Sequence, residues 1–233
     1  MKENGKFTDS LFHLYFSEDP KRAIGLLNAL DGTDYPGDSK VQFITLERAP
    51  FMDGVNDLSF VIDGRLIVFA ELPSTMNHNM ALWMLLYLRR VYEFLLTPEA
   101  TYRSKRIDLP VPKFFVLYDG AEEALAHEVQ QLSDAFMQKD GPAPFDLTVD
   151  VFNINYSRDN EVLKRSKSLE EYALFIDCVR KHKQVMGFSD AIKTAIGECV
   201  DRGIMKEFWQ KHGGNVESWM QQLPPDHKEQ QKL

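Results

Sequence analysis

The sequence predicts an α/β fold: a mixed sheet of about five strands flanked by helices, followed by a helical C-terminal annex. Strand-like apolar runs alternate with helical segments up to about residue 158, and from residue 161 onward only helical spacing recurs. The 233 residues, 44% of them hydrophobic, favour one domain with a sizeable core over two domains. We expect an α/β core over residues 1–158, a helical region over 159–222 packed on or next to it, and a polar tail over 223–233.

The first part of the chain predicts two helices and a three-stranded meander. Residues 7–30 show helical spacing, and Pro20 marks a break between two helices. Three strands are expected at "VQFITLE", "DLSFVID" and "RLIVFAEL". The last two flank Asp63-Gly64, a strong signal for a two-residue hairpin turn. Asp57 and Glu71 therefore fall at the ends of this hairpin away from the turn, where pairing can bring them close.

The middle of the chain predicts one buried helix and two further strands separated by a second helix. Residues 80–96 are apolar on nearly every side, which is typical of a helix buried against a sheet, and Trp83 and Trp209 read as packing anchors. "LPVPKFFVLYDG" predicts a strand, "AEEALAHEVQQLSDAF" (residues 121–136) a helix, and "FDLTVDVFNINY" another strand.

Charge and cysteine content limit the class of protein. A net charge of −8 argues against a general nucleic-acid-binding protein, although short basic segments occur. Cys178 and Cys199 form no C-x-x-C, disulfide framework or zinc spacing, and neither shows a histidine and acid context that suggests a nucleophile. The start of the chain lacks a signal-peptide core, and the longest apolar run, residues 80–88, is too short to span a bilayer. We expect a soluble, cytoplasmic protein with no membrane partner.

Asp57 and Glu71 are the candidate ligands of a hard divalent cation. Hydrolysis of a phosphodiester by Mg²⁺ needs oxygen ligands, usually one or two carboxylates with waters. Side chains alternate along a strand, so residue 73 shares the face of Glu71, and a Lys or Gln there could orient the attacking water. This spacing, D-(x)n-E-x-K/Q, is weak evidence alone, because an acid beside a turn is common.

Longer stretches of the sequence are more specific than this short spacing, because they resemble a known family. "NDLSFVIDGRLIVFAELPSTMNHNMALWMLLYLRRVYEFLL" resembles the core of the recombination-promoting nuclease (Rpn) family, also described as PD-(D/E)XK nuclease-family transposases. "TDSLFHLYF", "LPVPKFFVLYDG", "LSDAF", "VFNINY", "SLEEYALFIDCVR" and "AIGECVDRGIMKEFWQKH" are similar to family stretches in the same order. The resemblance spans residues 8–220 approximately and implies a restriction-endonuclease-like core. It also implies metal-dependent cleavage of DNA linked to recombination or mobile elements.

Carried over to this chain, the resemblance implies Asp57 and Glu71 as catalytic metal ligands, with Mg²⁺ or Mn²⁺ as the cofactor. The backbone carbonyl of Leu72 joins this set, and Asp9 matches an acidic position near the family's site less closely. The chain departs from the family at Pro73, where related chains carry the activating Gln. Proline has no side-chain donor and no N–H, so this position cannot orient a water. Three nearby residues could substitute, although each also has a simpler structural role: Gln42, Ser74 and His78.

Two functions follow from the resemblance. The first is an Mg²⁺-dependent DNA endonuclease, weakened at residue 73, with the basic segments 103–106 or 164–167 on backbone phosphates. The second is a degenerate relative that binds DNA or a protein, using an exposed apolar patch of Met205, Phe208 and Trp209. The expected partner is DNA, and a homodimer is left open.

Overall fold

The computed structural model describes residues 2–44, 58–73, 75–97, 102, 104–120, 122–137, 141–156 and 161–215. The chain folds into two compact units, a sheet unit over residues 38–153 and a helical unit made of residues 1–37 and 154–233. None of the helices in the described part of the chain has the length and apolar content needed to cross a bilayer.

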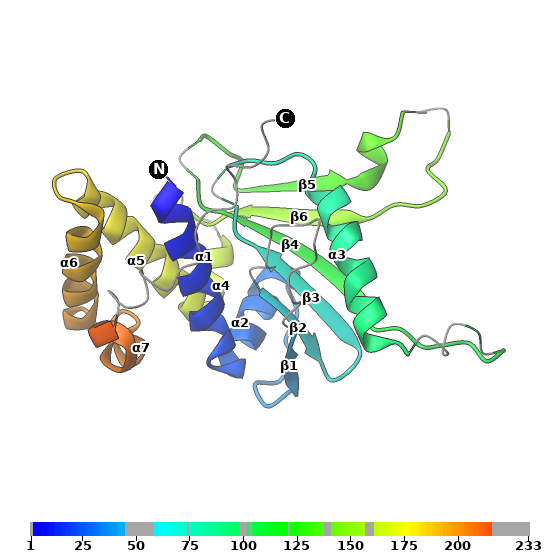
Figure 1. The fold of residues 1–233 in the computed structure, drawn as a ribbon, viewed down its shortest axis with the longest axis horizontal. Helices are drawn as coiled ribbons and strands as arrows, with labels where there is room; N and C mark the ends of the chain where they lie inside the picture. The colour runs from blue at the N-terminus through cyan, green and yellow to red at the C-terminus, as the bar shows by residue number, and fades with distance from the viewer. Residues whose placement is uncertain are drawn as a thin grey trace. The chain divides into compact units, whose positions relative to one another are not determined.

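A mixed sheet of six strands forms the centre of the sheet unit (Figure 1), which confirms the α/β class and adds a strand to the expected number. Its spatial order is β1-β2-β3-β4-β6-β5. β2 pairs antiparallel with both β1 and β3. β4 lies between β3 and β6 and runs parallel to both, and β5 pairs antiparallel with β6. The strand bounds are β1 Val41–Phe43, β2 Leu58–Ile62, β3 Leu66–Glu71, β4 Val111–Tyr118, β5 His127–Gln131 and β6 Thr148–Asn153.

The β2–β3 hairpin forms at the expected turn. Asp63 and Gly64 have left-handed φ values of 50° and 67°, but the turn holds three residues, Asp63, Gly64 and Arg65, instead of the expected two. Pairing runs from Ile62 opposite Leu66 to Leu58 opposite Ala70. The start of β2 and the end of β3 therefore lie at the same end of the sheet, as the sequence predicts.

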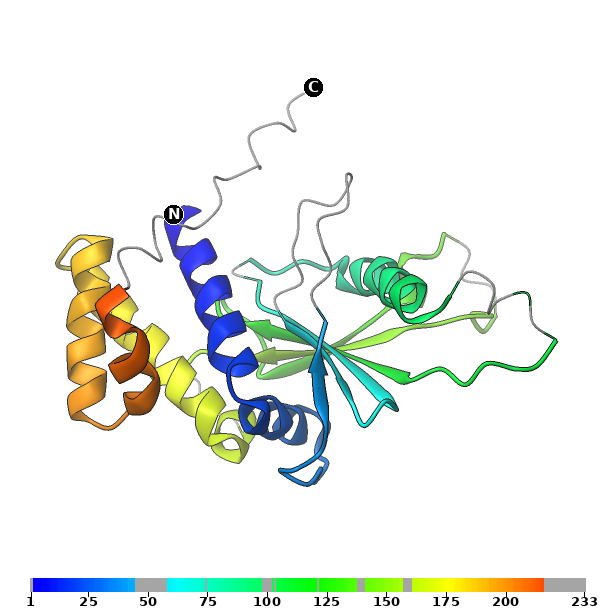
Figure 2. The same ribbon diagram turned by 60° about the horizontal axis from the view of Figure 1, so that its bottom comes forward.

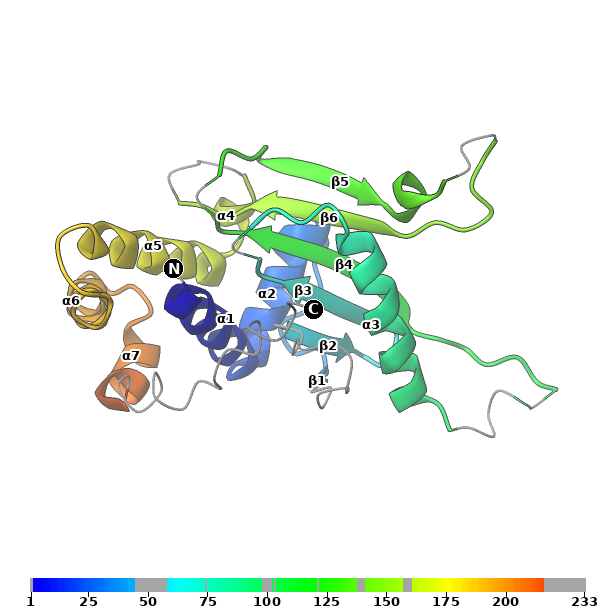
Figure 3. The same ribbon diagram turned by 45° about the horizontal axis from the view of Figure 1, so that its top comes forward.

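Helix α3 (Met80–Leu95) crosses one face of the sheet (Figures 2 and 3). Met80, Met84 and Tyr87 are buried against Phe69 and Val116 of that face. The helix is not buried on every side, because its outer side bears partly exposed Leu82, Trp83, Leu86 and Phe94. The expected burial of this helix against the sheet is confirmed. Trp83 is 38% exposed, so the expectation that it is a packing anchor is wrong.

The expected helix over residues 121–136 is wrong. Residues 127–131 form the edge strand β5, and only the short 3₁₀ turn η2 (Leu132–Ala135) follows it. His127 lies 2.9 Å from the Asp150 carboxylate and its ring stacks on Phe152, both in β6. Ala, Glu and Leu are good helix formers, but intrinsic helix propensity is worth less than about 1 kcal/mol per residue, and pairing with a neighbouring strand overrides it here.

The helical unit combines both ends of the chain. Its elements are α1 Lys2–Ser17, α2 Pro20–Asp31, α4 Glu161–Arg165, α5 Lys167–Lys183, α6 Phe188–Asp201, α7 Lys206–His212 and the 3₁₀ turn η3 Gly213–Asn215. The break at Pro20 is confirmed, and Asp19 caps α2 by accepting a hydrogen bond from the Lys21 amide. Residues 1–37 thus pack with the C-terminal helices in one unit, which differs from the expected boundary at residue 158.

Aromatic side chains join the two chain ends. α1 and α5 lie side by side (Figures 1 and 3), with Phe12 and Phe16 at 5.4 and 6.2 Å from the Tyr172 ring. Tyr15 stacks edge-on against Phe208 of α7 at 5.2 Å. Such edge-to-face pairs add to the free energy gained by burying the rings. These contacts link residues more than 150 positions apart, which sequence periodicity does not reveal.

Glu18 ties the end of α1 to α7. Burial raises the pKa of this carboxyl, but hydrogen bonds from Lys211 and His212 outweigh it and hold the pKa below the ordinary value of 4.5. A lowered pKa in the folded state stabilises the protein above the ordinary pKa, and this stabilisation is lost as the pH falls through the lowered value.

We expect Glu18→Gln to reduce the free energy of unfolding by about 1 kcal/mol at pH 7, the upper range for partly exposed pairs. The difference between variant and starting protein should shrink as the pH falls below the ordinary carboxyl pKa. Urea titrations across this pH range measure the difference, with Glu207→Gln in α7 as the control. A difference that grows in acid would contradict the assignment.

Candidate functional site

Glu71 closes strand β3 on the face covered by α3. Its neighbours on the same strand face, Ile67 and Phe69, are fully buried in the apolar layer under α3. Glu71 is half-buried and pairs in parallel register with Val116 of β4. A carboxylate that continues an apolar face is costly to bury unless a cation or hydrogen bonds compensate its charge. This position therefore suits an oxygen ligand of a metal.

The other three expected metal ligands differ from Glu71 in where they lie in the structure. Asp57 lies outside the described residues, directly before Leu58, the first residue of β2. Leu72 follows Glu71 with its side chain only 3% exposed, so its side chain belongs to the core and only its backbone oxygen is a candidate ligand. Asp9 is half-buried in α1, which belongs to the helical unit and not to the sheet unit.

Pro73 is half-buried just after β3. The three residues that could replace the activating side chain at position 73 lie at different places along the chain. Gln42 is exposed on the edge strand β1, in agreement with its reading as an edge residue. Ser74 lies outside the described residues. His78 is exposed and lines a pocket of about 390 Å³ with Gln130 and Asp134, beside the first turn of α3; Glu71 does not line this pocket.

The carboxyl ends of the three parallel strands gather further polar residues. Glu71 ends β3, Asp119 directly follows β4, and Asn153 ends β6. Asp119 and Asn153 are almost completely buried, and the Asn153 amide donates to the Ala124 carbonyl. Ligands of open α/β sheets bind at this edge, so Asp119 is a site candidate that the sequence did not single out. The sequence did contain a signal for Asp119, because this acid directly follows an apolar strand.

The basic segments are solvent-exposed where they are described. Lys105 and Arg106 are exposed in the sheet unit, whereas Arg103 lies outside the described residues. Lys164 pairs with Glu161 and Lys167 with Glu171, each at 3.6 Å. Both lysine side chains are exposed, at 52% and 86%, and ion pairs of exposed lysines are weak.

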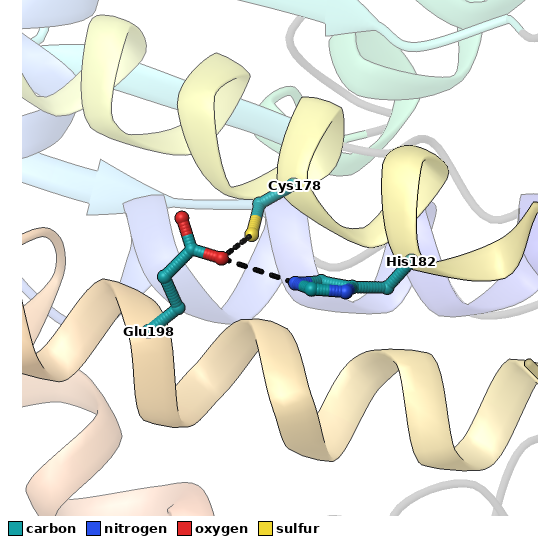
Figure 4. Close-up of side chains that lie close together, drawn as sticks. All are labelled: Cys178, His182 and Glu198. Carbon is teal, nitrogen blue, oxygen red and sulfur yellow. Dashed lines mark hydrogen bonds and ion pairs between the residues drawn. The ribbon is translucent and has the colours of Figure 1, made fainter. Parts of the chain in front are cut away.

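A second cluster joins α5 to α6 in the helical unit (Figure 4). Cys178 and His182 lie four residues apart, which places both on one side of α5. The Glu198 carboxylate of α6 accepts a hydrogen bond from the Cys178 thiol at 3.4 Å and lies 3.0 Å from the His182 Nε2. Both contacts use Oε2, while the Arg202 guanidinium donates to Oε1 at 2.9 Å.

The cluster shifts the acidity of its members. Burial, followed by the hydrogen bond to Glu198, raises the pKa of the Cys178 thiol to about 12. Hydrogen bonds from His182, Cys178 and Arg202 lower the pKa of the Glu198 carboxyl. Cys199, the next residue, is fully buried, and burial raises the pKa of its thiol too. The thiol of Cys178 is therefore protonated at neutral pH unless a cation replaces its proton.

Two expectations about the helical annex are wrong. Cys178 does have a histidine and an acid beside it, because the packing of α5 on α6 brings Glu198 across from a Cys and His one helical turn apart. The patch of Met205, Phe208 and Trp209 is not exposed, since each of these residues is 2% exposed. The rings of Phe175 and Phe208 pack against Trp209, one tilted and one edge-on, which confirms this tryptophan as a packing anchor.

Sequence reasoning could have found half of the cluster. The four-residue spacing of Cys178 and His182 inside a helix is visible in "CVRKH". Glu198 is one of several acids in the next helix, and only the packing of the two helices selects it.

Comparison with protein-family models, with curated proteins and with solved structures finds no match to this chain.

Proposed function

We propose that the chain is a metal-dependent DNA endonuclease of the recombination-promoting type, acting in the cytoplasm. Asp57 and Glu71 are the metal ligands, with Mg²⁺ or Mn²⁺ as the cofactor. The observation that carries this proposal is the half-buried carboxylate of Glu71 at the carboxyl end of an otherwise apolar, buried strand. The chemistry needs an acid at this position, whereas packing of the strand does not.

The order of the strands supports the proposal. An antiparallel meander, a helix and a strand parallel to the third one follow each other as β1–β3, α3 and β4. This arrangement is compatible with a restriction-endonuclease-like core. The proposal requires that Asp57 comes opposite Glu71, one residue beyond the Leu58–Ala70 pair that ends the described hairpin.

The residues fit a hard cation in chemistry. A carboxylate from Glu71, a second from Asp57 and the Leu72 carbonyl are oxygen donors of the kind that Mg²⁺ accepts. The bound cation would neutralise charge on the phosphate and lower the pKa of an attacking water. Lys105 and Arg106 would hold the DNA backbone without reading its bases. No side chain at Pro73 orients the water, so we expect slow cleavage.

The test is nicking of supercoiled plasmid by the full chain with Mg²⁺ or Mn²⁺. We expect slow cleavage that Asp57→Ala abolishes and that Pro73→Gln accelerates by about 10²- to 10³-fold, the usual effect of one orienting group. Glu93→Gln, on the exposed side of α3, is the matched acid control. No cleavage by any variant, Pro73→Gln included, would reject the nuclease.

A degenerate relative that binds without cutting is the second candidate. Its support is Pro73 together with the exposed apolar side of α3, where Leu82, Trp83, Leu86 and Phe94 face outward. Exposed apolar residues gathered on one helix face are typical of an interaction surface. Retained DNA binding without cleavage would favour a DNA-binding module, and loss of both would favour a protein partner.

A further inference from the structure

We propose that Cys178, His182 and Glu198 form a binding site for a divalent cation of the zinc class, which joins α5 to α6. The site lies wholly within the helical unit and is separate in sequence and in ligand chemistry from the proposed Mg²⁺ site. It therefore stands or falls independently of the proposed nuclease activity.

The spacing of the three ligand atoms matches a tetrahedral zinc site. The thiol sulfur, the imidazole nitrogen and the carboxylate oxygen all lie within 4.8 Å of one another. Zinc bonds of about 2.3 Å to sulfur and about 2.0 Å to nitrogen or oxygen place tetrahedral ligands about 3.5 Å (S to O) and about 3.3 Å (N to O) apart. The corresponding distances here are 3.4 and 3.0 Å. The sulfur-to-nitrogen distance is within 4.8 Å, so side-chain movements of about 1 Å would bring this third pair to its tetrahedral separation of about 3.5 Å.

The donor types select the cation. A thiolate and an imidazole are the ligands of Zn²⁺ and related transition metals, whereas Mg²⁺ and Ca²⁺ take oxygen. Three protein ligands leave a fourth position open for water. The Glu198 side chain is 42% exposed and that of His182 24% exposed, so a cation can enter from solvent.

The surroundings hold the ligands in place. α5 and α6 are joined by the short connection of residues 184–187 and pack side by side (Figure 1). Arg202 holds the far oxygen of Glu198 and leaves Oε2 directed at Cys178 and His182. A hydrogen-bonded carboxylate ligand is the usual outer support of a metal centre.

Binding must release the thiol proton of Cys178, because only the thiolate is a ligand. The Zn²⁺ affinity should therefore rise with pH by about tenfold per pH unit for this proton. The charged or titratable groups that act on this thiol, or on its neighbours, are His182, Glu198, Cys199, Arg202, Asp177 and Lys181.

The test uses Co²⁺ as a spectroscopic substitute for Zn²⁺, added to the full chain with a non-thiol reductant. We expect a thiolate-to-cobalt charge-transfer band that Zn²⁺ displaces. Cys178→Ser should remove the band, and Glu198→Gln should weaken Zn²⁺ binding by about 100-fold or more, beyond the loss from an outer-shell change. Cys199→Ala is the matched cysteine control and should keep the band.

Stability gives a second measurement. Free Zn²⁺ at 100 times its Kd should raise the Tm of the starting protein by about 5 to 10 °C and that of Glu198→Gln by about 1 °C or less. Glu198 is exposed enough that the variant should fold, as circular dichroism can verify. The proposal is overturned if Co²⁺ gives no thiolate band, if Cys178→Ser keeps it, if Cys199→Ala loses it, or if Zn²⁺ stabilises Glu198→Gln equally.

Discussion

Glu71→Gln should reduce the rate of metal-dependent plasmid cleavage by about 10³-fold or more. The variant should be as stable as the starting protein or more stable. Glutamine keeps the shape of the side chain and removes the charge that would hold the cation. The side chain continues the apolar face of Ile67 and Phe69, so a neutral group is less costly to bury there.

The measurement is best made in the Pro73→Gln background, where cleavage should be fast enough to follow a large loss. Glu93→Gln in the same background controls for the general effect of removing an acid. Urea unfolding of each variant separates the two roles of Glu71. If the role of Glu71 is structural, Glu71→Gln would instead leave cleavage unchanged, or would lower the free energy of unfolding by more than about 2 kcal/mol because the partners of the carboxylate become unsatisfied.

Phe16→Ala should destabilise the helical unit by about 3 to 5 kcal/mol, the range for removing a buried aromatic ring. Phe16 is 0% exposed and packs against Phe12 at 4.7 Å, Tyr15 at 5.2 Å and Tyr172 at 6.2 Å. Its removal opens a cavity between the two chain ends, which α1 and α5 bring together.

Hydrogen exchange by mass spectrometry locates this effect. Amides in α1 and α5 should exchange faster in Phe16→Ala, and urea unfolding should give the size of the loss. Val185→Ala, with a side chain 79% exposed, should change stability by less than about 0.5 kcal/mol. A loss below about 1 kcal/mol for Phe16→Ala would mean that the aromatic contacts do not hold the two chain ends together.

Local signals in the sequence determined most of the elements. Pro20 separates the first two helices, Asp63-Gly64 makes the hairpin, and the apolar run from Met80 becomes α3. Each signal acts within one turn or one strand, so its effect does not depend on distant residues. The Glu71 end of β3 was visible for the same reason, because an acid closing an apolar strand is a local pattern.

The tertiary structure decided what depends on distant contacts. Residues 127–131 became a strand because β6 offers an edge, against their own helical preference. Trp209 became buried because Phe175 lies beside it, and Cys178 gained Glu198 because α5 packs on α6. Periodicity shows which face of an element is apolar but not which other element covers that face, and the choice of partner decides burial, pKa and ligand sets.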